Sequence, residues 1–166
     1  MPRATVDTGM EIEYETFGDP GDPTLLLVNG YTSQLLAWQV GLVEAFVAQG
    51  LHVVRYDNRD VGLSTKLDGQ RANPMKVQRA IRDGGEVPDV PYRLTDMAAD
   101  GMGLLTALGV ERAHVAGMSM GGMIVQTMSI EHPDRVLSMT SIMSNPGDVR
   151  IGAPTPEARD ALSASR

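Results

Sequence analysis

The sequence predicts an α/β fold, in which a mostly parallel sheet follows an antiparallel N-terminal hairpin and carries helices on both faces. First, short continuous apolar runs such as 24–28 alternate with longer segments of helical pattern. Strands buried on both faces have this composition, and the alternation is typical of parallel strands joined by helices. Second, apolar and acidic residues alternate over 10–17, after the turn-forming Asp7-Thr8-Gly9. Ligands bind beyond the carboxyl ends of the strands in such sheets.

Residues that cap or break helices set the predicted boundaries. Thr95 is the expected N-cap of one helix, Gly50 and Gly109 end two helices, and Pro133 stops a third. In chain order the predicted elements are hairpin strands 4–8 and 10–17, strand 24–28, helix 38–49, strand 51–56, helix 96–108, strand 112–118, helix 120–131, strand 136–143 and a weak helix at 156–163.

We expect residues 1–166 to be the N-terminal part of a single domain. The core covers about 1–145, and 146–166 is a tail or the start of a cap. Between them, 57–93 is polar, rich in Gly and Pro, and longer than an ordinary connection, so it is predicted as a long loop.

The composition excludes several classes of function. The net charge of −7 disfavours nucleic acid as a partner. The chain has no cysteine, which excludes a thiolate metal site, and its three histidines are not spaced as metal ligands, so no metal is expected. No apolar run approaches the ~18 residues of a membrane span, and the N-terminus lacks a secretory signal. A cytoplasmic location is therefore expected.

Gly117-Met118-Ser119-Met120-Gly121 fits the pattern G-x-S-x-G between a predicted strand and a predicted helix. This context is typical of a nucleophile elbow, a sharp turn that lifts the serine hydroxyl above the sheet. Gly117 and Gly121 are expected to support the elbow, because side chains there would collide across the turn. The alternative interpretation is a glycine-rich turn in which Ser119 is only an N-cap, and the strand before and the helix after favour the elbow.

Asn29-Gly30-Tyr31-Thr32 follows the first buried strand. An oxyanion hole takes one backbone N–H from such a loop and one from the residue after the nucleophile. The predicted donors are therefore Tyr31 and Met120, although an Asn-Gly turn alone is common anywhere. After the second buried strand, Asp57 and Arg59 are expected to pair and to fix their loop, without a catalytic role.

These segments resemble the α/β-hydrolase superfamily over roughly residues 10–145. The phrase Arg55-Tyr56-Asp57-Asn58-Arg59-Asp60-Val61-Gly62-Leu63-Ser64, together with Gly117 to Met123, is similar to bacterial serine carboxylesterases, including lipase/esterase proteins and anthracycline methyl esterases. The resemblance implies ester hydrolysis through an acyl-enzyme on Ser119, a small-molecule ester substrate and no cofactor. Many members have His-Gly where this chain has Asn29-Gly30, and Gly at the position of Asp60.

The family order of catalytic residues is Ser, then Asp or Glu, then His. After Ser119 the sequence contains one histidine, His132, at the far end of the predicted helix and roughly 20 Å away. His114 lies five residues before Ser119 in a strand, roughly 16 Å away. His52 is at the start of the second buried strand, which is the end of the sheet opposite the site. None is placed as the base. Asp148, after the last strand, is an acid position in few relatives.

The sequence therefore predicts an incomplete or two-chain serine hydrolase, with the C-terminal strands and the cap missing. Strand 136–143 would then be an exposed edge, which a second chain or a second copy would cover. The competing hypothesis is a non-catalytic module of this fold that binds a small apolar ligand or a partner protein. Epoxide opening is a third alternative, but it usually needs an aspartate where this chain has Ser119.

Overall fold

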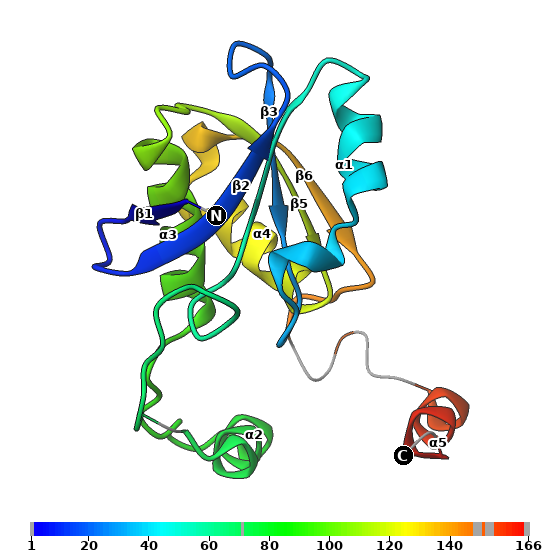
Figure 1. Cartoon of the computed structure of the whole chain (residues 1–166). Helices are drawn as coiled ribbons and strands as arrows, with labels where there is room; N and C mark the ends of the chain where they lie inside the picture. The colour runs from blue at the N-terminus through cyan, green and yellow to red at the C-terminus, as the bar shows by residue number, and fades with distance from the viewer. Residues whose placement is uncertain (1, 71, 148–150, 152–154, 165–166) are drawn as a thin grey trace.

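A computed structural model describes residues 2–70, 72–147, 151 and 155–164 (Figure 1). Its strands are β1 (Arg3–Thr5), β2 (Glu11–Phe17), β3 (Thr24–Val28), β4 (His52–Tyr56), β5 (Ala113–Met118) and β6 (Val136–Ile142). Its α-helices are α1 (Val40–Val47), α2 (Pro74–Asp83), α3 (Leu94–Ala107), α4 (Met120–Glu131) and α5 (Pro156–Ala164), with short 3₁₀ turns η1 (Leu35–Ala37) and η2 (Pro133–Arg135).

The strands form one six-stranded sheet in the order β1-β2-β4-β3-β5-β6. The hairpin of β1 and β2 is antiparallel, and β2 also pairs antiparallel with β4. The remaining pairs, β3 with β4, β3 with β5 and β5 with β6, are parallel. The predicted fold class is confirmed. β3 lies at the centre and is buried along its whole length.

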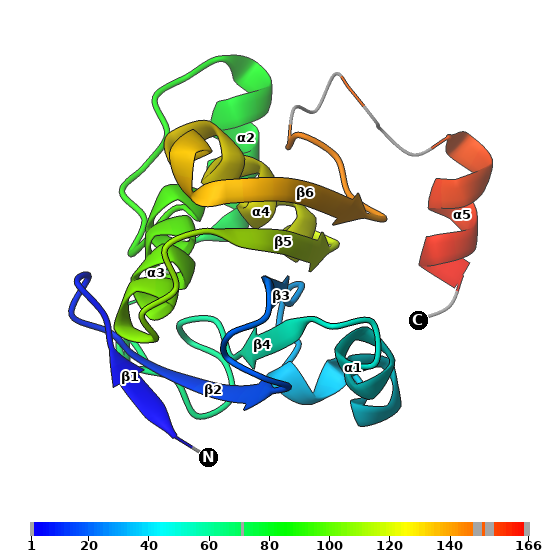
Figure 2. The same cartoon turned by 90° about the horizontal axis from the view of Figure 1, so that it is seen from above.

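Helices cover both faces of this sheet, and their side chains build two apolar clusters. On one face α3 and α4 pack against the sheet, with Leu26, Tyr56 and Ile124 fully buried. On the other face Trp38 and Val43, from the region of α1, pack against Leu27. Figure 2 shows α1 on one side of the sheet and α3 and α4 on the other. The parallel strands consequently direct their carboxyl ends to one edge, where the connecting segments meet.

The segment 57–93 contains a helix, α2, that the sequence-based reading as a loop missed. Its signals are local: the Asn73 side chain accepts hydrogen bonds from the N–H groups of Met75 (3.1 Å) and Lys76 (3.2 Å), and Pro74 is its first residue. Gly84 ends it in the left-handed conformation, with φ of 66°. The Gly and Pro residues of the segment are therefore in part helix-terminal residues.

The N-cap of α3 also differs from the prediction. The helix begins at Leu94, and Thr95 lies inside its first turn. The N–H of Arg93 donates to the Asp96 carboxylate at 2.6 Å, so Asp96 fixes the start of the helix. An acidic residue in the first turn of a helix is favoured by the helix dipole as well.

A buried ion pair joins the loop after β4 to α3. Arg59 donates to the two carboxylate oxygens of Asp100 at 2.6 Å and 2.7 Å, and the Thr8 hydroxyl donates to the same carboxylate at 2.5 Å. The expected pair of Arg59 with Asp57 is therefore wrong. Burial by itself would lower the pKa of Arg59, but the hydrogen bonds to Asp100 raise it. Asp100 faces the sheet from an otherwise apolar helix side, where it meets Arg59.

In the described part of the chain β6 pairs only with β5, and it exposes the apolar side chains of Leu137, Met139 and Ile142. Among the described residues no helix is long and apolar enough to span a membrane.

Replacing Asp100 with Ala should destabilise the fold by about 3–5 kcal/mol, because it leaves the Arg59 charge buried without its partner. Urea denaturation would measure the free energy of unfolding. Asp68→Ala, at an exposed position of the preceding loop, is the control and should change it by no more than about 0.5 kcal/mol. Equal effects of the two substitutions would contradict a structural role for the ion pair.

Candidate active site

Ser119 occupies the turn between β5 and α4 in a conformation that L-residues rarely adopt. Its φ is 57° and its ψ is −123°, and its side chain is exposed. Non-glycine residues with positive φ cost of order 1–3 kcal/mol and cluster at functional sites. The Ser119 N–H donates to the carbonyl of Ile142 at 2.9 Å, which ties the turn to the end of β6.

The two glycines of the motif allow backbone segments to approach one another closely. A Cβ atom added to Gly117 would lie 2.1 Å from the carbonyl oxygen of Gly121. One added to Gly121 would lie 2.2 Å from the carbonyl oxygen of Val28, at the end of β3. Both distances are far below any real contact, so only glycine fits at either position.

The loop after β3 lies against this turn. A Cβ atom on Gly30 would be 3.2 Å from the Cβ of Ser119. Asn29 is buried and anchors the loop, because its side-chain amide donates to the Tyr56 carbonyl at 3.1 Å. Tyr31 follows and is 75% exposed. The backbone of Tyr31 is thus placed in the loop beside Ser119.

Met120 is the first residue of α4. The first N–H groups of an α-helix have no partner within the helix and lie at the positive end of its dipole. The N-terminus of α4 therefore presents donors next to the Ser119 hydroxyl.

A buried carboxylate holds the loops on the opposite side of the site. Asp57 accepts hydrogen bonds from the N–H of Leu35 at 2.7 Å and from the N–H of Leu63 at 2.9 Å. Gly62 lies so close that a Cβ atom there would be 1.8 Å from the carboxylate. Asp57 thereby links the segments that follow β3 and β4, and this structural role agrees with the expectation that it takes no part in catalysis.

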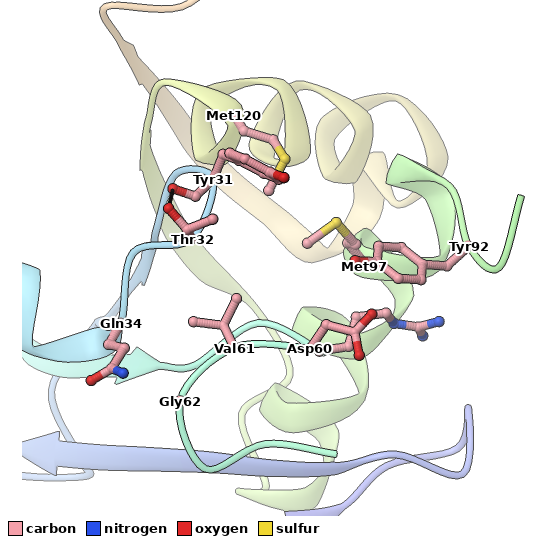
Figure 3. A pocket seen from close by; sticks show the side chains of 10 residues that line it. Tyr31, Thr32, Gln34, Asp60, Val61, Gly62, Tyr92, Met97 and Met120 are labelled. Carbon is pink, nitrogen blue, oxygen red and sulfur yellow. Dashed lines mark hydrogen bonds between the residues drawn. The ribbon is translucent and has the colours of Figure 1, made fainter. Parts of the chain in front are cut away.

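A cavity of about 280 Å³ lies between these loops (Figure 3). Figure 3 shows Tyr31 and Met120 on one side, and Asp60, Met97 and Tyr92 on the other, with their side chains turned toward a common space. Its lining residues are Tyr31, Thr32, Gln34, Arg59, Asp60, Val61, Gly62, Tyr92, Met97 and Met120. The cavity combines aromatic and thioether surface with one carboxylate, Asp60, that has no salt bridge to another lining residue.

The side chains of Arg59 and Tyr92 stack, with the guanidinium carbon 5.5 Å from the ring centre. Burial, and next the charge of the Asp60 carboxylate and a hydrogen bond to it, raise the pKa of Tyr92, so its hydroxyl keeps its proton and donates to Asp60. The sequence offered little signal for Asp60, Tyr92 and Met97, because they become neighbours only when the segment 57–93 folds back onto the sheet.

All three histidines lie within the described residues, and none lines this cavity. His132 follows the last residue of α4. The imidazole of His114 lies 2.7 Å from the Ser138 hydroxyl, and that of His52 lies 3.0 Å from the Thr24 hydroxyl, at the start of β4. A general base must approach the serine hydroxyl to about 3 Å. Asp148 lies outside the described residues.

Within residues 2–70, 72–147, 151 and 155–164, no group of three His, Asp or Glu side chains is placed to hold a metal ion. The groups available at this turn are the backbone N–H groups, the exposed Ser119 and the side chains of the cavity.

Comparison with known proteins decides the family. The sequence profile described as alpha/beta hydrolase fold matches residues 23–163. The chain belongs to the α/β-hydrolase fold family. Rhodomycin D methylesterase DnrP of Streptomyces peucetius is 34% identical over 139 residues, which cover 84% of this chain and 41% of the methylesterase.

Other relatives of this α/β-hydrolase chain are hydrolases as well. Epoxide hydrolase A of Mycobacterium tuberculosis is 27% identical over 154 residues, 92% of this chain and 41% of the relative. The crystal structure of a hydrolase from Pseudomonas aeruginosa PA01 superimposes with a TM-score of 0.68 at 26% identity, over 99% of this chain and 51% of that one. The chain thus spans about two fifths of the length of the curated relatives it matches.

Gly117→Ala should disrupt the turn, because the new methyl group would clash with the backbone of Gly121. A loss of about 1–3 kcal/mol of stability is expected, measured by urea denaturation. Gly41→Ala in α1, where nothing lies within 4 Å of the new methyl group, should instead stabilise the protein by up to about 1 kcal/mol. A Gly117→Ala protein as stable as the parent would contradict the observed turn geometry.

The free energy of unfolding should decrease as the pH is lowered, because of His52. Burial lowers the pKa of His52 below its ordinary value of 6.5, against the opposing charges of Asp19 and Asp22. The unfolded chain therefore binds this proton more readily, and folding stability is lost as the pH drops below about 6.5. His52→Gln should flatten the dependence between pH 7.5 and 5, with His132→Gln as the control for removing a histidine. An unchanged slope in His52→Gln would rule out this linkage.

Proposed function

We propose that this chain carries the nucleophile half of a serine carboxylesterase, in which Ser119 forms an acyl-enzyme with a small-molecule ester. One observation carries the proposal: Ser119 is held at φ 57°, ψ −123° between β5 and α4, with its side chain exposed at the carboxyl end of the sheet. Such strain persists where the surrounding structure enforces it, and the close contacts of Gly117 and Gly121 do so here.

In the proposed reaction the Ser119 hydroxyl attacks the carbonyl carbon of the ester while its proton passes to a general base. The N–H groups of Tyr31 and Met120 stabilise the oxyanion. The C–O bond to the alcohol then breaks, and the protonated base returns its proton to the leaving alkoxide. Water, deprotonated by the same base, then attacks the acyl-enzyme carbonyl, and the acid is released as Ser119 regains its proton.

The general base of this reaction is not among the described residues near Ser119. We propose that it comes from polypeptide that packs beside β6, whose open edge and exposed Leu137, Met139 and Ile142 favour a further strand there. A second chain or a second copy of this chain would meet the same requirement.

Ester chemistry is favoured over epoxide chemistry by the residue at the turn. The relatives include both a methylesterase and an epoxide hydrolase. A serine at the nucleophile position suits acyl transfer, whereas epoxide opening usually uses an aspartate there. Ser119 therefore favours the ester as substrate class.

The absence of a nearby histidine in the described residues also supports a second candidate, a non-catalytic module that binds a small apolar ligand or a partner protein. Both candidates predict an occupied cavity, and they differ in the reactivity of Ser119. The test therefore follows the serine itself.

Incubation with p-nitrophenyl acetate should acetylate Ser119, detected by mass spectrometry of its peptide. Without its base the serine is expected to react about 10⁴–10⁶-fold more slowly than in a complete site. The hindered base 2-methylimidazole should accelerate the acetylation, because it supplies the missing proton acceptor.

Ser119→Ala should abolish the adduct and the accelerated release of p-nitrophenol. Ser129→Ala, in the same helix with its hydroxyl bonded to the Val125 carbonyl at 2.8 Å, should change neither. Equal p-nitrophenol release by the parent and Ser119→Ala, with and without the base, would exclude the esterase and leave the binding module.

A further inference from the structure

A second cavity adjoins the first. It has a volume of about 450 Å³ and shares Tyr31, Asp60 and Tyr92 with the first cavity. Its other lining residues are Gln70, Ala72, Val77, Val90 and Pro91. The three shared residues form a neck between two lobes. The first lobe lies beside the elbow loops, and the second lies under the segment 57–93.

The helix α2 supplies one wall of the second lobe. Val77 lines the lobe, and Val77 and Ala80, three residues apart on one helix side, are both half-buried. Lys76 and Arg79 are exposed, and Arg79 forms an exposed ion pair with Asp83 at 3.4 Å. The helix therefore contributes Val77 to the lobe, while Met75 and Ile81, like Lys76 and Arg79, are exposed to solvent. Figure 1 shows α2 beyond the carboxyl ends of the parallel strands, the end of the sheet that carries the site.

Asp60 gives the neck its charge. Its φ is 64°, and one carboxylate oxygen accepts the N–H of Leu67 at 2.6 Å, which fixes the side chain. The neighbouring cation, Arg59, is neutralised by Asp100 through two hydrogen bonds. Lys66, in the same loop, is exposed and donates to the Gly62 and Ser64 carbonyls. A negative charge therefore faces the neck beside two tyrosine rings.

We propose that the two lobes form one substrate site, which takes an ester whose larger half is apolar and carries an ammonium group that binds Asp60. The inference rests on the proposed esterase function for its reacting bond, at Ser119. Carboxylates and aromatic rings together attract ammonium groups. An anionic substrate would meet the like charge of Asp60, so the neck favours ammonium groups over acids and phosphates.

Val77 becomes a specificity-determining residue in this arrangement, because it limits the depth of the second lobe. The wall of the site then comes from the segment between β4 and α3. A larger side chain at position 77 would fill the lobe without touching Ser119 or the loops around it.

Binding of two small probes tests this site without needing catalysis. 1-Naphthylmethylamine carries an ammonium group at pH 7, and 1-naphthalenemethanol is its neutral counterpart of nearly equal shape. Isothermal titration calorimetry on the whole chain should give tighter binding of the amine. Asp60→Asn, which keeps the shape and the acceptor for Leu67, should weaken amine binding about tenfold and leave the alcohol unchanged.

Matched variants separate the site from general effects. Asp68→Asn removes an exposed carboxylate of the same segment and should leave both affinities unchanged. Val77→Trp should weaken both probes about tenfold or more by filling the lobe, whereas Val87→Trp, at an exposed position of the same segment, should not. Amine binding that is insensitive to Asp60→Asn, equal binding by the two Trp variants, or no binding to the parent would each overturn the inference.

These results are independent of the acetylation of Ser119. Acetylation without Asp60-dependent binding would leave the esterase standing and remove the ammonium site. Asp60-dependent binding without acetylation would establish the two-lobed site in a module that does no chemistry.

Discussion

The arrangement depends on one steric constraint, the contact of three backbone segments at the turn that holds Ser119. Gly121, in the first turn of α4, lies against the last carbonyl of β3, and Gly117, in β5, lies against Gly121. Hydrogen bonds between β3 and β5 hold the same strands side by side. No side chain separates the backbones of β3, β5 and α4 at this point, so any movement of one segment away from the others breaks these contacts. The unfavourable conformation of Ser119 is a consequence of this close packing, and its stability cost is carried by the central sheet.

Buried carboxylates extend this rigidity to the loops that surround the turn. Asp57 satisfies backbone N–H groups of the two loops after β3 and β4, and Asp100 neutralises Arg59 across to α3. Buried charges of this kind cost free energy unless every lone pair and proton finds a partner. The network therefore gives the carboxyl end of the sheet a defined polar layer, and Val77 of α2 lines a cavity beside it.

The sequence predicted what depends on local patterns. The continuous apolar run of β3, the alternation in β2 and the strand–G-x-S-x-G–helix order identified the fold and the position of Ser119, because periodicity and turn chemistry act within a few residues. Residues whose partners lie far along the chain could not be predicted in this way. Arg59 was expected to pair with Asp57, two residues away, and pairs instead with Asp100, 41 residues away. The helix α2 was missed although Asn73, Pro74 and Gly84 mark its ends. It is only 10 residues long, and the polar, glycine-rich residues around it are typical of a loop.

In the proposed function, the residues for ligand recognition lie in this chain, whereas the general base for catalysis does not lie near Ser119 among the described residues. The neck at Asp60 and the wall at Val77 of the proposed site come from a single stretch between β4 and α3. The nucleophile, by contrast, requires a proton acceptor that these residues do not bring within reach, because each histidine is held elsewhere by the fold. If the proposed ligand site forms before the reacting group is activated, binding energy is available as soon as a base is supplied. Since catalysis follows only from interactions made in the transition state, under the proposed function the part that supplies the base would set the rate, and the part described here would select which molecule is offered to it.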